Sequence, residues 1–463
     1  MTNRTKLIII VILALLIRVG LLVRHQHTYY ASGLTQGLLA RNIAEGRGLV
    51  GGEFESKKLA ELQAERGALV EISEIPVYEN DTYRPFIFDM PGYGILLAGI
   101  WSVTGHYNYI YVRVLQIVID SLMVFLIFWI VRELFDARSA LIAGLLYAIY
   151  LPQAFMCVHP LRDCWSMFVV ILIVYLIIQY KNNPTLWKAL GIGLLVGAGT
   201  YLRPNLAIVT VPVCLFAIPY LGRWKATKLL FVSLAVVVLM LMPWWVRNYK
   251  IFHKFIPLSA NGGAAFWGGM GMIPNQYGFG YSDEVMDSWV KEQGLPCAYG
   301  TPEFSDVLRE RAFDVMKKDP LFYLKTVAYR IPLAVFPAAY WGLEPPDYES
   351  KISWNYALWR EQTGGGMKQY AREHPFIFLY KALRWVGIVV LFLAGLAGIW
   401  LRRKQYPQVL LLISVPFYFI GAHSTLTYPN PRYLLPGTWV YLVFAGIFLQ
   451  SILGRWKRNK SSA

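Results

Sequence analysis

The sequence predicts an all-α polytopic membrane protein with about ten transmembrane helices and two large outer loops that carry interfacial helices. Hydrophobic residues make up 56% of the 463 positions and charged residues only 16%, a balance too apolar for a domain whose surface faces water. The hydrophobic residues also form separate runs near the ~20 residues that a helix needs to cross a bilayer. Both observations indicate one membrane domain over residues 1–463.

Ten such runs follow one another along the chain. The first has a basic start like that of a signal peptide, but no small-residue cleavage site follows it, so we expect it to be retained. Gly and Pro interrupt several later runs, which transmembrane helices tolerate when their neighbours satisfy the freed backbone groups. The predicted spans cover residues 6–23, 109–131, 139–157, 164–180, 187–203, 205–222, 228–247, 378–401, 408–423 and 434–453.

Short basic clusters between the runs predict the orientation. If the N-terminus is cytoplasmic, every short loop obeys the positive-inside rule, as the cluster Arg402–Lys404 does. Both termini are then cytoplasmic, and the long segments 24–108 and 248–377 are the first and second outer loops, with C-terminal transmembrane helices over 378–463. Because the net charge of +16 lies in these clusters and not along one polar face, we predict no nucleic-acid partner.

The two outer loops contain predicted structure of their own. The first holds a helix around 32–45, a polar insertion at 51–84, and an apolar stretch at 91–103 that is too short to span and should lie at the membrane interface. The second begins with a glycine-rich segment, 259–272, a candidate ligand-binding loop because glycine permits tight backbone geometry. An amphipathic helix is predicted at 302–318. We expect the chemistry of the protein to lie in these loops.

Seven short motifs occur in a fixed order along almost the whole chain. They are Leu39–Gly48, Met90–Tyr93, Arg113–Gln116, Ala140–Pro152, Leu202–Pro204, Pro243–Asn248 and Pro431–Pro436. Their order around this topology resembles the GT-C superfamily of membrane glycosyltransferases, especially the family-39-like bacterial protein O-mannosyltransferases and aminoarabinose transferase.

The resemblance implies a GT-C-like bundle in a bacterial inner membrane, with the active site on the outer side. It also implies transfer of a sugar from a polyprenyl-phosphate-linked donor to a lipid, glycan or protein acceptor. Such transfer needs a carboxylate that deprotonates or orients the acceptor. It also needs arginines or a divalent cation to stabilise the charge on the departing phosphate.

Arginines at the outer ends of the predicted spans could stabilise the charge on the departing phosphate. Arg203 and Arg432 each lie at such an end, and Arg162 lies in the short loop between the third and fourth spans. Charges near membrane depth are costly and usually functional, so we expect these side chains to bind substrate. Further candidates for substrate binding are Arg247, for which interfacial anchoring beside tryptophans is the alternative, and the motif residues Tyr93 and Tyr433.

The requirement for a carboxylate that deprotonates or orients the acceptor exposes a departure from the family pattern. Family members carry an acid about eight residues before the position equivalent to Ala40, where this sequence has Ser32. Asp89 is one replacement for the missing base, although it also suits a capping carboxylate. Glu53 or Glu55 is another, if the polar insertion folds over the site. The third explanation is a protein that transfers poorly or not at all.

Asp163 is the second candidate catalytic carboxylate. It matches a position where family members carry an acid that helps bind metal or position the acceptor, and its alternatives are a helix cap or a partner of Arg162. His159 and Asp163 together offer only two metal ligands, which is weak support for a metal site. We predict no structural metal, and a divalent cation stays an open option as cofactor.

Two other function classes fit some of these features. A transporter of lipid-linked substrates would also have many spans, but transporters usually show repeats or broken helices at the midplane, whereas the polar candidates here lie at one membrane face. A catalytically silent relative that binds lipid-linked sugar during envelope polysaccharide assembly would explain the absence of an acid at Ser32.

Overall fold

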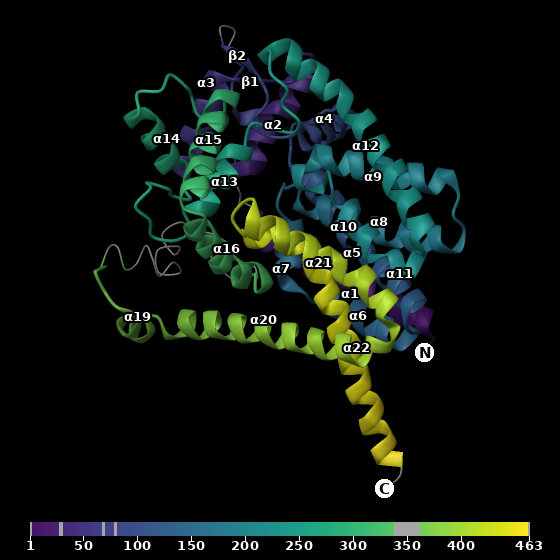
Figure 1. The fold of residues 1–463 in the computed structure, drawn as a ribbon. Coiled ribbons are helices and arrows are strands. Elements are labelled where there is room, and N and C mark those ends of the chain that lie inside the picture. The colour runs from purple at the N-terminus through teal and green to yellow at the C-terminus, as the bar shows by residue number, and fades with distance from the viewer. Residues whose placement is uncertain are drawn as a thin grey trace.

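The computed structural model describes residues 2–26, 31–66, 70–77, 81–337, 360 and 363–461. Within these ranges, a single two-stranded sheet accompanies the helices, so the predicted all-α polytopic fold is confirmed. Figure 1 shows a bundle of long helices with a layer of shorter helices and the sheet at one end. Helix α1 begins, and α22 ends, at the opposite end of the bundle.

The bundle contains all ten predicted spans. In the described part of the chain, seven helices are long and apolar enough to cross a membrane. They are α1 (Asn3–Arg24), α5 (Ile110–Leu134), α8 (Asp163–Asn182), α12 (Arg223–Phe252), α20 (Pro375–Leu401), α21 (Tyr406–Thr425, which follows η3, Arg403–Gln405) and α22 (Pro431–Ser461).

The other three predicted spans are shorter or broken helices. An eighth crossing is the pair α6 (Ala137–Ala148) and α7 (Leu151–Cys157), which is bent by 56°. Pro152 lies in the first turn of α7, where its missing N–H does no harm but prevents a continuous helix. The other two predicted spans are shorter apolar segments: α9 (Leu186–Leu202), and a run divided among η2 (Pro204–Leu206), α10 (Thr210–Phe216) and α11 (Ile218–Leu221).

The layer at the end of the bundle is built from the two predicted outer loops. The first contributes α2 (Ala31–Ala44), β1 (Val50–Gly52), α3 (Glu53–Arg66), η1 (Ile72–Glu74), β2 (Tyr83–Pro85) and α4 (Gly92–Thr104). The second contributes α13 (Gly262–Met270), α14 (Asp283–Glu292), α15 (Pro302–Lys318) and α16 (Pro320–Val335), whereas its last helix, α19 (Met367–Glu373), packs against α20 (Figure 1). The predicted helix at 302–318 has the boundaries of α15, whereas the antiparallel β1–β2 pair was not predicted.

The glycine-rich segment 259–272, predicted to be a loop, contains helix α13. A Cβ atom on Gly263 would lie 1.8 Å from the carbonyl oxygen of Ser305, and one on Gly269 would lie 2.7 Å from that of Thr427. The glycines therefore let α13 pack closely against α15 and against the segment that precedes α22. Trp267 on this helix anchors a second hydrophobic core that binds α13, α14, α15 and α16 together.

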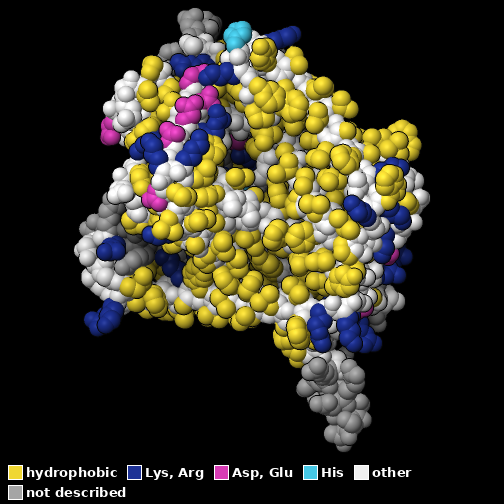
Figure 2. All heavy atoms as spheres, viewed as in Figure 1, with side chains coloured by type: hydrophobic (Ala, Val, Ile, Leu, Met, Phe, Trp, Pro, Cys, Tyr) yellow, Lys and Arg dark blue, Asp and Glu magenta, His cyan; other side chains and the backbone are white. Residues whose placement is uncertain are grey.

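The surface of the bundle is apolar. Figure 2 shows hydrophobic side chains over much of it, while charged side chains gather over part of the layer and near the opposite end. Leu16, Phe231 and Leu239 are 63%, 68% and 62% exposed. So much exposed apolar surface is typical of a protein that spans a membrane several times.

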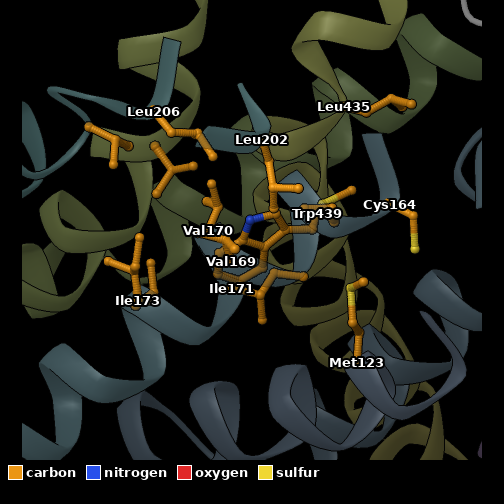
Figure 3. Close-up of a cluster of buried hydrophobic side chains, with 14 of the residues drawn as sticks. Met123, Cys164, Val169, Val170, Ile171, Ile173, Leu202, Leu206, Leu435 and Trp439 are labelled. Atoms are coloured by element: carbon orange, nitrogen blue, oxygen red, sulfur yellow. The ribbon is translucent and has the colours of Figure 1, made fainter. Parts of the chain in front are cut away.

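A tightly packed core lies where α8, α9 and α22 meet. Figure 3 shows side chains from these helices converging around Trp439, which is fully buried. Three members of this core are chain neighbours, or near neighbours, of predicted site residues: Leu202 precedes Arg203, Cys164 follows Asp163, and Leu435 lies three positions after Arg432. Packing in this core therefore fixes the backbone from which the site is built.

Close packing between α20 and α22 gives a first testable expectation. A Cβ on Gly398 would lie 1.9 Å from the carbonyl oxygen of Phe444, so we expect Gly398→Ala to cost about 1–3 kcal/mol by overpacking. Gly421, also helical, has open space at its Cβ position, and Gly421→Ala should be neutral or slightly stabilising. Thermal unfolding of both variants in one detergent checks this, and equal unfolding temperatures would contradict it.

Candidate active site

A cavity of about 460 Å³ lies between the bundle and the layer. Its bundle side carries the predicted arginines and their neighbours, namely Arg162, Arg203, Asn205, His423, Arg432 and Tyr433. Its layer side carries residues from α2, from the segment before α4, and from α13, α14 and the loop after α14, among them Thr35, Asp89, Asn261, Asp283 and Tyr299. A larger groove of about 770 Å³ between α1, α5 and α8 contains none of the predicted site residues.

The positions of the three arginines follow from helix ends. Arg203 lies between α9 and Pro204, and the proline forces it into an extended conformation with φ −143° and ψ 124°. Arg432 is the second residue of α22, after Pro431, and its backbone N–H donates to the Asn430 side chain at 3.2 Å. Arg162 directly precedes α8. Three helix ends thus direct guanidinium groups into one cavity.

Tyr433 separates two of these guanidinium groups. The Arg203 and Arg432 guanidinium carbons lie 4.7 Å and 5.0 Å from its ring centre, and Arg432 also donates to its hydroxyl at 3.2 Å. Cation–π attraction to the ring holds both positive groups near one another. His423 lies on the same side, 5.5 Å from the Tyr433 ring, and shares a 3.1 Å hydrogen bond with Asn205.

Asp163 lies behind the cavity wall and forms an ion pair with Arg203. Its side chain is 1% exposed and that of Arg203 is 6% exposed. As the first residue of α8, the carboxylate is also favoured by the helix dipole. Because Asp163 is not part of the cavity lining, it orients the cation that is. The Nε atom of Arg203 is buried and has no hydrogen-bond partner among the described residues.

Asp89 lines the cavity and forms an ion pair with Arg162, with 2.8 Å between the charged atoms. Burial, the largest single effect, lowers the pKa of Arg162, but the charge and hydrogen bond of Asp89, together with Tyr433, raise it overall. Both predicted carboxylates therefore have an arginine partner, and the two pairs meet at the start of α8. Asp89 and Arg203 line the cavity, whereas Asp163 lies directly behind Arg203.

Two predicted substrate-binding residues lie outside the cavity lining. Arg247 donates to the backbone oxygens of Phe86 and Leu49 at 2.9 and 3.0 Å, so it fastens the first outer loop to α12. Tyr93 is buried, and its hydroxyl donates to Gln116 at 3.1 Å. Gln116 in turn donates to the carbonyl groups of residues 157 and 159, so Tyr93 supports the loop that carries Arg162.

The position of Arg247 leads to a second expectation. Arg247→Gln should lower the stability of the protein by about 1–2 kcal/mol through the lost hydrogen bonds. Its affinity for a polyprenyl phosphate should stay close to that of the unaltered protein, because the guanidinium group does not line the cavity. Thermal unfolding with and without that lipid checks both statements. A variant that is stable but no longer binds the lipid would place Arg247 at the ligand after all.

The alternative acids of the first outer loop have separate positions. Glu55 is buried, forms an ion pair with Arg41 at 2.7 Å, and does not line the cavity. The side chains of Ser32 and Glu53 lie outside the described residues. Thr35, three positions after Ser32 on α2, does line the cavity, so this helix reaches the site.

The donor set gives little support to a metal ion. Within the described ranges, no group of three His, Cys, Asp or Glu side chains could hold one. His159 and Asp163 do not converge on such a group, and the Asp89 and Asp163 carboxylates are each engaged by an arginine. The described side chains of the site therefore offer no complete set of metal ligands.

Several cavity residues were not predicted from the sequence. Asp283 is the first residue of α14, and Tyr299 lies in the loop after that helix. His423 lies near the end of α21. Burial, followed by the charge of Asp283, raises the pKa of Tyr299. The only sequence signal was a polar His423 at the end of an apolar run. Asp283 looked like any acid in the first turn of a helix.

Comparison with known sequences gives one family match. The model of the family described as dolichyl-phosphate-mannose-protein mannosyltransferase matches residues 88–246, a range that contains Asp89, Asp163 and Arg203. No curated protein sequence matches the chain.

Solved structures give a match along the whole chain. The oligosaccharyltransferase of Archaeoglobus fulgidus, tethered with an acceptor peptide, matches 99% of this chain and 51% of its own at 13% identity, with a TM-score of 0.52. Its apo form matches 98% and 51% at 14% identity, with a TM-score of 0.51. ArnT from Cupriavidus metallidurans, bound to undecaprenyl phosphate, matches 96% and 77% at 12% identity, but its TM-score of 0.39 is too low to carry an argument.

The chain spans about half the length of the oligosaccharyltransferase structures that it matches. At this identity the likeness shows the fold. Together with the family match, it confirms the resemblance to GT-C membrane glycosyltransferases that the sequence motifs predicted.

Proposed function

We propose that this chain is a glycosyltransferase that moves a hexosyl or pentosyl group from a polyprenyl-phosphate-linked donor to a lipid, glycan or protein acceptor. The observation that carries the proposal is the convergence of Arg162, Arg203 and Arg432 on one cavity beside an apolar bundle. Arginine binds phosphate through charge-assisted hydrogen bonds. The apolar surface of the bundle suits the prenyl chain, and the cavity at the end of the bundle would hold the phosphate at the end of that chain.

The carboxylates have different parts in this proposal. Asp163 positions Arg203 from behind, since the two form a buried ion pair. Asp89 lines the cavity and contacts the acceptor, orienting its hydroxyl toward the sugar. The arginines stabilise the negative charge that develops on the departing polyprenyl phosphate in the transition state.

We also propose a location for the protein. The basic clusters of the short loops favour cytoplasmic termini in a bacterial inner membrane. The layer lies at the end of the bundle away from the start of α1 and the end of α22 (Figure 1). The cavity lies between this layer and the bundle, so the site would face the outer side. Acceptors would approach through the layer.

Transfer of radiolabelled sugar from a polyprenyl-phosphate hexose or pentose tests the proposal. Permeabilised membranes from cells that produce the protein carry lipid, glycan and protein acceptors, and membranes without the protein are the control. Label should move into one acceptor class only when the protein is present. Binding of the donor without any transfer would favour the silent lipid-linked-sugar binder, because both predicted carboxylates are paired with arginines.

A further inference from the structure

Glycosyl transfer to a hydroxyl group requires a carboxylate that can accept a proton, and the described carboxylates of the site are not equivalent in this respect. Asp163 is behind the wall and bound to Arg203. Asp89 reaches the cavity, but Arg162 engages its carboxylate at 2.8 Å. A carboxylate in such a pair has to give up its ion pair with the arginine before it can hold a proton. Neither predicted acid is therefore well suited to take the proton itself.

Asp283 is the cavity carboxylate with different surroundings. It lines the cavity from the layer side, opposite the arginines, and is exposed. Among the described residues, no lysine or arginine forms an ion pair with it. Its exposure also gives a proton a direct path to water. Asp283 thus combines access to the cavity with freedom from a cation.

The position of Asp283 is fixed by packing. Ser282 caps α14 by accepting a hydrogen bond from the Val285 backbone N–H at 3.4 Å, which starts the helix at Asp283. One turn later, Met286 is buried in the core of the layer. A capped helix start that is anchored on the next turn holds the carboxylate at a defined place on the cavity wall.

Tyr299 connects this carboxylate to the opposite acid. Its ring packs against Phe88, the residue before Asp89, with 5.4 Å between ring centres, and against Phe304 at 5.3 Å. Both Asp283 and Asp89 lie near enough for their charges to raise the pKa of its hydroxyl, after burial, which has the largest effect. The two acids therefore face one part of the cavity, where an acceptor would lie.

Resting on the glycosyltransferase function proposed above, we propose that Asp283 is the general base of the reaction and replaces the acid that is missing at Ser32. A carboxylate oxygen of Asp283 takes the proton of the acceptor hydroxyl. The acceptor oxygen forms a bond to the anomeric carbon of the sugar, while the bond from that carbon to the phosphate oxygen breaks. The phosphate leaves with the electron pair as polyprenyl phosphate, and Asp283 releases its proton to water.

Three substitutions in the full chain test this assignment in the permeabilised-membrane assay. Asp283→Asn should lower the rate of label transfer by about 100-fold or more, the usual contribution of a general base. Glu284→Gln, a matched control at the next position of the same helix turn and outside the cavity lining, should keep the unaltered rate. In Asp283→Ala, added formate should restore part of the rate as an external base.

Stabilisation by polyprenyl phosphate in thermal unfolding shows whether each variant is folded and binds the donor. We expect Asp283→Asn and Asp283→Ala to be stabilised as the unaltered protein is. An Asp283→Asn protein with the unaltered rate, or an Asp283→Ala protein that binds polyprenyl phosphate but gains no rate from formate, overturns the assignment. Absence of transfer by the unaltered protein instead overturns the proposed function, and this inference with it.

Discussion

Replacing Arg203 with methionine is expected to destabilise the protein by about 3–5 kcal/mol, because breaking a buried ion pair leaves the remaining charge without compensation. That charge is Asp163, whose side chain is 1% exposed. Thermal unfolding in detergent measures the loss. Lys254→Met is the matched control, since Lys254 pairs with Glu303 and Asp306 at 3.2 Å on the surface, at 42% exposure. An exposed pair of that kind is worth about 1 kcal/mol or less.

The double variant Arg203→Met/Asp163→Asn separates a structural role of Arg203 from ligand binding. Removing both charges should recover much of the stability, since no unpaired carboxylate is left behind the wall. The proposed phosphate contact would still be missing, so polyprenyl phosphate should bind to the double variant much more weakly than to the unaltered protein. Unchanged binding by a stable double variant would mean that Arg203 only holds Asp163.

Sequence reasoning found the arginines for a physical reason. A charged residue at the end of an apolar run stands out, because such a position is costly unless the charge has a use. Pro204 and Pro431 beside Arg203 and Arg432 also mark helix ends. The convergence of these ends depends on contacts between α8 and α22, which are far apart along the chain, and no local pattern in the sequence reports such a contact.

The same limit explains the residues that were missed. Asp283 begins an amphipathic surface helix, where acids are common because they favour the helix N-terminus. Only the packing of Met286 and Tyr299 turns this helix start toward the cavity. The β1–β2 pair was missed as well, since a three-residue strand with two glycines has no alternation to detect.

The span prediction succeeded because its signal is local. All ten predicted runs are helical, including the run 205–222, which is divided among η2, α10 and α11, and the run 139–157, whose two helices are bent by 56°. The length of an apolar run predicts a membrane-embedded segment, but it does not tell whether one straight helix crosses the membrane there. The break after α9 is functional in our proposal, since it is where Arg203 leaves the helix and reaches the cavity.

The bundle wall of the site has an excess of positive charge, and this leads to a second large effect. Arg162, Arg203 and Arg432 lie close enough together for their charges to repel one another. Among the described residues, Asp89 from the layer side and Asp163 from behind the wall are the acids paired with them, so three positive groups meet two negative ones. A bound phosphate would relieve this repulsion. An anionic ligand should therefore stabilise the folded protein strongly.

We expect a short-chain polyprenyl phosphate, at 100 times its Kd, to stabilise the protein by about 2.7 kcal/mol. The uncharged polyprenol of equal length should have little effect, because it offers no group for the arginines. Arg432→Gln should remove most of the stabilisation. Arg4→Gln should not, because Arg4 lines the separate groove between α1, α5 and α8. Equal stabilisation by the polyprenol, or loss of the effect in Arg4→Gln alone, would show that the lipid binds along the bundle and not at the arginine cavity.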